Sequence, residues 1–502
     1  MATESGSGGE DLASLDATAQ AELIRRGELS ALEAVEAAIG RIEAVNPQIN
    51  AVITPLYDGA RAAAVALDRA RPAWGDHTLA PFAGVPFLIK DLMVHTAGDR
   101  YCAGMPVLKA IDYRPAHDTE LAVRFRRAGL VVLGKTNTPE WGSLPTTEPL
   151  AFGATRNPWH LDHSPSGSSG GSAAAVASGM VPMASGGDGG GSIRVPASAC
   201  GLFGLKPARG RVPSGPDHGE VWGGFASEGV ISRSVRDSAA ALDAVAGAQW
   251  GDANVAPPPG RPYRREVGAP VGRLRIGVLT QAPGQIHEVH PDCVVAVSDA
   301  AQLLAELGHE VETGHPAALD EAAEFRRHFG VIVSAHAAAD FDHWERVVGR
   351  PLTEADIEPV DWAVVQRAKA RPTGRYLESV TWVDQWRRRL CSWWVDVDLL
   401  LTPTMANPPV RLGELVHTAE DPMAGMAKAG PSIVFTSPFN ASGQPAMSVP
   451  LWWNDAGLPV GVQLVGAPWR EDVLFRVAAQ LESARPWAER RPPVWAGSPA
   501  AG

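Results

Sequence analysis

Two glycine-rich loops, each carrying a serine, are the segments of this chain best suited to covalent chemistry. Ser168 lies in Pro165-Ser-Gly-Ser-Ser-Gly-Gly-Ser172, and Ser192 follows 24 residues later in Asp188-Gly-Gly-Gly-Ser-Ile-Arg194. Where a glycine loop enters a helix, unpaired backbone N–H groups bind anions and can stabilise a developing oxyanion. A serine hydroxyl at that place is a candidate nucleophile, provided that a base takes its proton.

Lys90 is the candidate base. It follows the apolar run Val85-Pro-Phe-Leu-Ile89, which predicts a buried strand, and it is one of only six lysines in the chain. Burial at a strand end disfavours the ammonium form and lowers the pKa of a lysine, which then becomes a usable general base. The alternative is that Lys90 forms an ion pair with Asp91 or with another acid at the strand end.

Three interpretations of the glycine loops compete. A phosphate cradle is disfavoured because neither G-x-x-x-x-G-K-[ST] nor G-x-G-x-x-G occurs. Gly167-Ser-Ser-Gly-Gly171 matches the G-x-S-x-G nucleophile elbow, but Pro165 stands where the preceding strand should be. A purely structural turn is the third. We favour catalysis because the two serines and Lys90 together supply a nucleophile, a relay and a base.

Composition narrows the class of partner. The chain has 502 residues, 45% of them hydrophobic and 20% charged, and a net charge of −12. An acidic chain lacks the electrostatic footprint for nucleic acid or an anionic membrane, so we expect a small-molecule partner. The four cysteines lie far apart, which predicts neither a metal site nor a disulfide framework. We expect no metal, no cofactor, no membrane association and, without a visible signal peptide, a cytoplasmic location.

Apolar runs and helical periodicity alternate along the chain. The capping box Ser30-Ala-Leu-Glu33 opens a helix that we expect to end at Asn46-Pro47. Buried strands are predicted over 85–89, 130–133, 181–184, 274–279, 397–401 and 461–465, and another strand is expected to start at 310–311. Further helices are predicted over about 58–70, 118–129, 170–178, 291–307 and 471–481. This order indicates an α/β fold with a mixed sheet.

The expected domain organisation is a flexible tail over 1–11 and a single domain over 12–502. We expect its first part, about 12–75, to be helical and its core to span about 80–312 and 396–490. Residues 313–395 are rich in charge and tryptophan and are predicted to form a helical cap layer. The Pro/Gly-rich stretch 256–272 is expected to be a surface loop.

These residues resemble the amidase-signature family of serine hydrolases over roughly 15–490. The resemblance implies one large mixed β-sheet flanked by helices on both faces. The segments that carry it are Gly84-Val-Pro-Phe-Leu-Ile-Lys-Asp91, Gly134-Lys-Thr-Asn137, Gly167-Ser-Ser-Gly-Gly171, Asp188-Gly-Gly-Gly-Ser-Ile-Arg-Val-Pro196, Gly204-Leu-Lys-Pro207, Arg233-Ser-Val-Arg-Asp237, Leu401-Thr-Pro-Thr404 and Pro438-Phe-Asn-Ala-Ser-Gly-Gln-Pro445.

The resemblance implies a Ser–cis-Ser–Lys triad working through an acyl-enzyme. Ser192 would be the nucleophile, Ser168, which follows a cis peptide in the family, the relay, and Lys90 the base. The backbone amides of Gly189, Gly190, Gly191 and Ser192 would form the oxyanion hole. Ser169, Asp188 and Arg194 would support the loop.

The chain departs from the family pattern at a few positions near the site. Gly187 stands where many members have Thr or Asn, Ser166 and Ala208 replace the more usual Gly and Thr, and three glycines precede Ser192. None of these touches the triad, but they bear on the oxyanion loop and the acyl pocket.

Within the family, other segments resemble the branch that cleaves 6-aminohexanoate cyclic dimers, among them Phe152-Gly-Ala-Thr-Arg-Asn-Pro-Trp159 and Gly349-Arg-Pro-Leu-Thr-Glu354. We therefore expect a stand-alone hydrolase of uncharged amides such as nylon-type oligomers and aryl amides, with carbamates (urethanes) as a further substrate class. We expect the tryptophans of 313–395 to wall a roomy hydrophobic pocket. The alternative is a glutamine-hydrolysing subunit of an aminoacyl-tRNA amidotransferase. A homodimer stays open.

Overall fold

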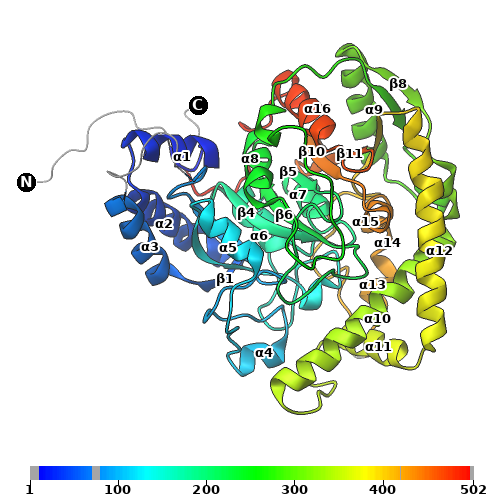
Figure 1. Cartoon of the computed structure of the whole chain (residues 1–502), viewed down its shortest axis with the longest axis horizontal. Coiled ribbons are helices and arrows are strands. Elements are labelled where there is room, and N and C mark those ends of the chain that lie inside the picture. Colours follow the sequence, from blue (N-terminus) through cyan, green and yellow to red (C-terminus); the bar gives the residue numbers. More distant parts are fainter. Residues whose placement is uncertain (1–10, 71–79, 419, 498–502) are drawn as a thin grey trace, which may run out of the picture.

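A single sheet of eleven strands forms the centre of the protein (Figure 1), in the order β1-β3-β2-β4-β6-β5-β10-β11-β9-β7-β8. The computed structural model describes residues 11–70, 80–418 and 420–497. The strands are β1 (Val52–Pro55), β2 (Pro86–Lys90), β3 (Val131–Thr136), β4 (Met183–Asp188), β5 (Phe203–Lys206), β6 (Ser227–Ser232), β7 (Arg275–Val278), β8 (Glu310–Thr313), β9 (Leu399–Pro403), β10 (Ala446–Trp453) and β11 (Pro459–Gly466).

The sheet is mixed, as expected, and its register brings Lys90 and the second glycine loop together. β2 is parallel to β3 and β4, whereas β6 is antiparallel to β4. Lys90 is the last residue of β2, and Asp188 is the last residue of β4. Because carboxyl ends of neighbouring parallel strands meet at one edge of a sheet, Lys90 and the loop after Asp188 lie side by side.

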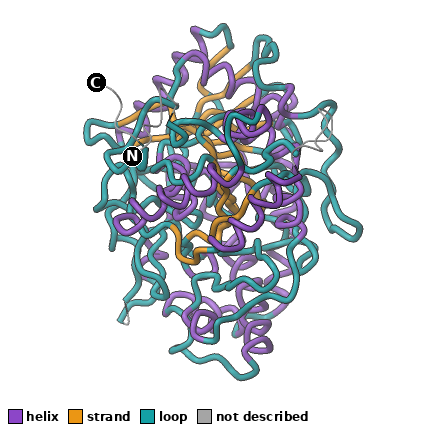
Figure 2. The backbone as a smooth tube through the Cα atoms, turned by 90° about the vertical axis from the view of Figure 1, so that its left-hand side faces the viewer, coloured by secondary structure: helices purple, strands orange, loops and turns teal. Residues whose placement is uncertain are grey.

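Helices cover both faces of the sheet, which explains why β2 is apolar at successive positions. Phe87 and Ile89 pack into one hydrophobic cluster, and Leu88 between them packs into the other. Figure 2 shows the strands in the interior with helices around them. The helices are α1 (Ala17–Arg26), α2 (Ala31–Ile49), α3 (Tyr57–Ala70), α4 (Pro106–Ala110), α5 (Glu120–Arg127), α6 (Gly170–Ala177), α7 (Arg194–Cys200), α8 (Val235–Val245), α9 (Pro291–Glu306), α10 (Ala322–Val348), α11 (Pro359–Lys369), α12 (Thr373–Cys391), α13 (Ala424–Lys428), α14 (Gly430–Ile433), α15 (Ser437–Ser442) and α16 (Glu471–Ala484).

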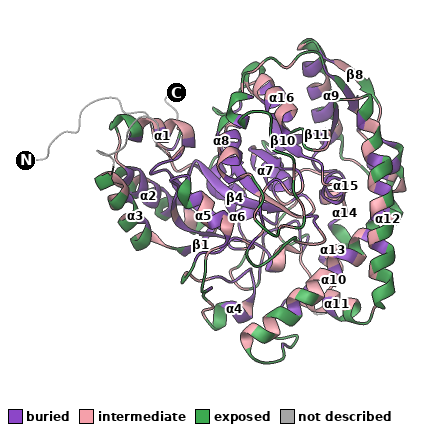
Figure 3. Ribbon diagram, viewed as in Figure 1, coloured by how far each residue is buried: buried purple, intermediate pink, exposed green. Residues whose placement is uncertain are grey.

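Three long helices, α10, α11 and α12, form the outer layer on one side of the molecule (Figure 1). The outward face of α12 is exposed along its length, whereas the central strands of the sheet are buried and the edge strand β8 is not (Figure 3). Within this layer the fully buried Trp386 stacks on Phe325 with 4.7 Å between ring centroids. In the described part of the chain, no helix is both long and apolar enough to span a membrane.

The structure corrects one helix end and adds strands that the sequence did not predict. The second helix does not end at Asn46-Pro47 but continues to Ile49, with Pro47 inside its last turns. The Asn46 side chain bonds the chain just beyond the helix, accepting from Ala51 and Val52 N–H at 2.8 Å. β1, β5, β6 and β10 were not predicted. Of the predicted tail 1–11, residues 1–10 lie outside the described residues.

Candidate active site

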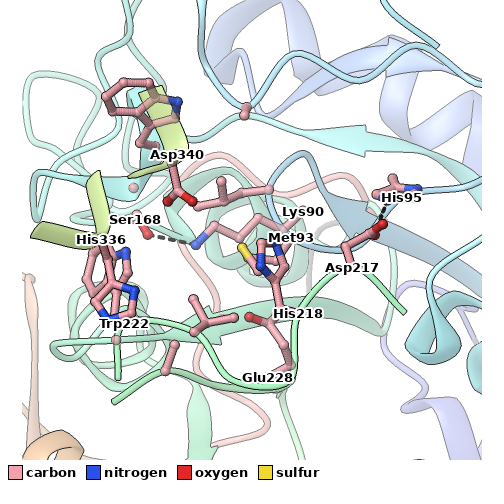
Figure 4. A pocket seen from close by; sticks show the side chains of 18 of the residues that line it. Lys90, Met93, His95, Ser168, Asp217, His218, Trp222, Glu228, His336 and Asp340 are labelled. Carbon is pink, nitrogen blue, oxygen red and sulfur yellow. Dashed lines mark hydrogen bonds and ion pairs between the residues drawn. The ribbon is translucent and has the colours of Figure 1, made fainter. Parts of the chain in front are cut away.

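Lys90 and Ser168 are in direct contact beneath a pocket (Figure 4). Lys90 Nζ donates a hydrogen bond to Ser168 Oγ at 2.7 Å, and each residue is 2% exposed. The backbone N–H of Lys90 donates to Ser185 Oγ on β4 at 2.8 Å, which fixes the strand end that carries the lysine. The Gly167–Ser168 peptide bond is cis, as the family resemblance implied.

Lys90 does not form an ion pair with Asp91, its neighbour in the sequence. Asp91 instead faces Lys135 of the Gly134-Lys-Thr-Asn137 segment, with 3.8 Å between Nζ and Oδ1. Burial lowers the pKa of Lys90 to about 8, although the negative charges of Glu228 and Asp188 act in the opposite direction. A substantial fraction of Lys90 is therefore neutral near physiological pH and able to accept a proton.

Ser192 lies just before α7 and lines the same pocket as Lys90 and Ser168. The two serine loops are joined by a hydrogen bond from the Ser169 N–H to the Ser192 carbonyl at 3.3 Å. Ser169 itself is fully buried, and its hydroxyl donates to the Gly187 carbonyl at 3.3 Å. The nucleophile-elbow match, which would make Ser169 the attacking group, therefore does not fit this arrangement.

Asp188 is the hub of the loop that carries Ser192. Its Oδ1 accepts from Gly191 N–H at 2.7 Å and from Arg194 Nη2 at 2.8 Å, and its Oδ2 accepts from Arg194 Nε at 2.9 Å. Both side chains are fully buried. Burial alone would raise the pKa of Asp188, but the charge and hydrogen bonds of Arg194 outweigh it and hold that pKa well below its usual value.

The C-terminal part of the chain braces this loop from the other side. Arg194 also donates to Asn440 Oδ1 at 2.6 Å and to Gln463 Oε1 at 2.7 Å. Asn440 Nδ2 donates to the Asp188 carbonyl at 2.7 Å, and Thr436 Oγ1 donates to the Gly190 carbonyl at 2.6 Å. Asn440 lies in a segment that carries the family resemblance, but no role was predicted for it. No sequence pattern indicated a role for Thr436 or Gln463.

Two of the three glycines before Ser192, Gly189 and Gly191, leave no room for a side chain. A Cβ at Gly189 would meet the Trp222 ring at 2.7 Å. Gly191 has a φ of +136° and lies against Thr436, whereas Gly190 has room around it. The Gly191 N–H, which was expected to contribute to the oxyanion hole, donates to Asp188 Oδ1 instead.

Glu228 lines the pocket, and no sequence pattern indicated it. It lies directly across from Gly187 in the β4–β6 pair, and its carboxylate occupies the space that a side chain at position 187 would need. Its Oε2 is buried without a hydrogen-bond partner among the described residues. Burial raises the pKa of Glu228 to about 7, partly opposed by Lys90. The glycine at 187, one of the departures from the family pattern, thus leaves room for the Glu228 carboxylate.

The pocket has a volume of about 310 Å³ and is lined by aromatic and titratable side chains. Of the six tryptophans in 313–395, Trp344 alone lines it in the part of the chain that the structure describes; Trp141 and Trp222 come from elsewhere. The expectation that these tryptophans wall the pocket is therefore wrong for five of the six, and five histidines and, besides Asp188, four acids contribute to the wall. These are His95, His117, His218, His336, His343, Asp217, Glu220, Glu228 and Asp340.

The amidase family matches residues 33–475, and the chain belongs to this family, the amidase-signature enzymes. It is 45% identical over 487 residues to the 6-aminohexanoate-cyclic-dimer hydrolase of Paenarthrobacter ureafaciens, covering 95% of this chain and 96% of the relative. A solved structure of 6-aminohexanoate cyclic dimer hydrolase complexed with substrate superposes with a TM-score of 0.90 at 43% identity, covering 96% of this chain and 99% of that one. A bacterial aryl acylamidase of the family superposes with a TM-score of 0.86 at 28% identity, covering 95% and 97%. The protein is an amide-bond hydrolase.

Proposed function

We propose that this amidase cleaves uncharged secondary amides by a Ser192–Ser168–Lys90 relay. The observation that carries the proposal is the 2.7 Å hydrogen bond between Lys90 and Ser168 in a pocket that Ser192 also lines. Neutral Lys90 takes a proton from Ser168, Ser168 takes one from Ser192, and Ser192 Oγ attacks the carbonyl carbon. The oxyanion then accepts hydrogen bonds from the N–H groups of the glycine loop.

Breakdown of the tetrahedral intermediate uses the same relay in reverse. Ser168 gives a proton to the nitrogen of the leaving amine, the C–N bond breaks, and the acyl group stays on Ser192. A water molecule deprotonated through Ser168 and Lys90 then attacks the ester and releases the acid. Lys90 returns to its neutral form at the end of the cycle, so one base serves both halves.

The proposed substrates are nylon-type oligomers, aryl amides and carbamates. Two relatives named for a cyclic amide and for aryl acylamides support the first two classes. The aromatic side chains of the pocket, among them Tyr101, Trp141 and Trp344, offer flat apolar surface to an aryl group. Carbamates are included because their carbonyl carbon is open to attack by the same serine, and the leaving group again takes a proton from Ser168.

The test is hydrolysis by the purified chain of a panel that contains a linear and a cyclic 6-aminohexanoate dimer, an aryl anilide, an aryl carbamate and glutamine. Turnover of the dimers or the anilide without glutamine supports the proposal. Glutamine as the sole substrate, or activity that appears only with added partner subunits, supports the amidotransferase alternative instead. Hydrolysis of the carbamate, or its absence, decides separately whether carbamates are substrates.

Variants test the residue roles on whichever substrate is cleaved. Ser192→Ala removes the nucleophile and should abolish turnover, and Lys90→Ala should lower kcat by several orders of magnitude. Ser298→Ala is the matched control. Ser298 lies on the exposed face of α9, and its hydroxyl donates a hydrogen bond to the Val294 carbonyl. An active Ser192→Ala enzyme would refute the assignment.

A further inference from the structure

A histidine–aspartate–histidine cluster lies in the wall of the pocket, away from the proposed triad. Asp217 Oδ2 is 2.9 Å from His95 Nε2, and Asp217 Oδ1 is 2.8 Å from His117 Nε2. Figure 4 shows the Asp217–His95 contact on the opposite side of Lys90 from Ser168. The three residues come from three separate segments: the β2–α4 loop, the α4–α5 connection and the long β5–β6 loop.

Both ring nitrogens of His95 face hydrogen-bond acceptors, and a neutral imidazole can donate from only one of them. Its Nδ1 faces the His117 backbone carbonyl at 3.0 Å, and a carbonyl can only accept, so the ring proton sits on Nδ1. In a neutral imidazole Nε2 then carries a lone pair, and this lone pair points at the Asp217 carboxylate. Two acceptors at 2.9 Å repel each other unless a cation lies between them, either a second proton or a metal ion.

We propose that His95, His117 and Asp217 form a binding site for a divalent transition-metal ion of the zinc class. Imidazole nitrogens and a carboxylate are the ligands that Zn²⁺ takes in three-ligand sites that keep a fourth position open. The ligand atoms all lie within 4.8 Å of one another. The carbonyl that accepts from His95 Nδ1 is the outer partner that fixes the tautomer and orientation of a metal-binding histidine.

Small movements are enough to admit the ion. Two ligands of a tetrahedral zinc ion with bonds of about 2.0–2.1 Å are about 3.4 Å apart, so each Nε2–carboxylate separation must open by about half an ångström. His117 is half-exposed, and the Asp217 side chain is 33% exposed, so both can shift without breaking the core. The bound ion would join three segments of the pocket wall that are 22 and 100 residues apart along the chain.

The experiment is a calorimetric titration of the EDTA-treated, dialysed full chain with ZnCl₂, with Tm measured in parallel. We expect one equivalent of Zn²⁺ to bind and Tm to rise with Zn²⁺ concentration. Asp217→Asn and His117→Asn should each weaken that binding at least tenfold. His290→Asn is the matched control, because His290 lies near Asp292 at 3.6 Å on the surface without a second histidine, and it should bind as the wild type does.

The outcomes separate the two cations that can lie between His95 and Asp217. Wild-type protein that binds no Zn²⁺ would overturn the metal site and leave a protonated His95 in its place. Binding that survives in both Asp217→Asn and His117→Asn would overturn it equally, because the ion would then sit elsewhere. If Asp217→Asn does not fold, the half-exposed His117 position supplies the test alone. The readouts are binding and Tm, so the result does not depend on which substrate the enzyme cleaves.

Discussion

Replacing Asp188 by asparagine tests whether one buried carboxylate holds the oxyanion loop. Six donors are aimed at its two oxygens, three at each. The asparagine side chain would keep one acceptor oxygen and place an NH₂ group against three donors. Three buried donors without a partner, at about 1–3 kcal/mol each, make the loss at least about 3 kcal/mol. Removing one partner of a buried ion pair costs about 3–5 kcal/mol in total, and we expect a loss of that size in the free energy of unfolding.

Thermal unfolding measures this loss. At about 2.1 cal/mol/K per residue, a chain of 502 residues has an unfolding entropy of about 1 kcal/mol/K, so the expected loss lowers Tm by about 3–5 °C. Asp384→Asn is the control, because it breaks the exposed Asp384–Arg387 pair and should shift Tm by less than about 1 °C. The reasoning fails if Asp188→Asn melts within about 1 °C of the wild type. In the folded variant kcat should fall far more than KM rises, because the loop that we propose to bind the oxyanion is loosened.

Three further predictions concern the pocket and the core. kcat/KM should rise with pH and level off above about 8, because Lys90 must lose its proton to act as a base; a flat profile between about pH 6 and 9 would speak against that role. Gly187→Ala should lower activity because its Cβ would collide with the Glu228 carboxylate, and the double variant with Glu228→Ala should recover part of the loss; no recovery would mean that the clash is not the cause. Burial raises the pKa of Glu140 well above its usual value and that of Glu358 to about 7, so their protonated forms stabilise the fold at low pH and this contribution is lost as the pH rises above about 4.5. Glu140→Gln should therefore raise Tm more at about pH 8 than at about pH 5, and an equal shift at both would contradict the linkage.

Local patterns predicted several strands whose side chains are mostly apolar, although β10 is also largely apolar and was missed. β2, β9 and β11 are runs of aliphatic residues buried on both faces, and sequence periodicity finds such runs directly. β6 was missed because Ser227–Ser232 is polar and contains a glycine; it is a strand because it pairs with β4 along its whole length. Pro47 shows the converse, since a residue that usually breaks a helix is tolerated near the end of α2.

The same limit applies to the candidate site. Lys90 and the two serine loops carry local signals, a charge at the end of an apolar run and glycines at helix starts, and the structure places all three at one pocket. Glu228 carries no such signal, because its importance comes from standing opposite Gly187. His95, His117 and Asp217 likewise have no spacing pattern, because they meet through the folding of three distant segments.

The brace from Thr436, Asn440 and Gln463 has a consequence for fragments and for synthesis. Every residue of the proposed triad and of the oxyanion loop is encoded before residue 193, in the first two-fifths of the chain. Yet Arg194 and Asp188 find part of their partners only after residue 435, and β10 and β11 insert between β5 and β9. We expect a nascent or truncated chain that stops short of these residues to contain every residue of the proposed triad and still be inactive. Activity should therefore appear only when nearly the whole polypeptide is present.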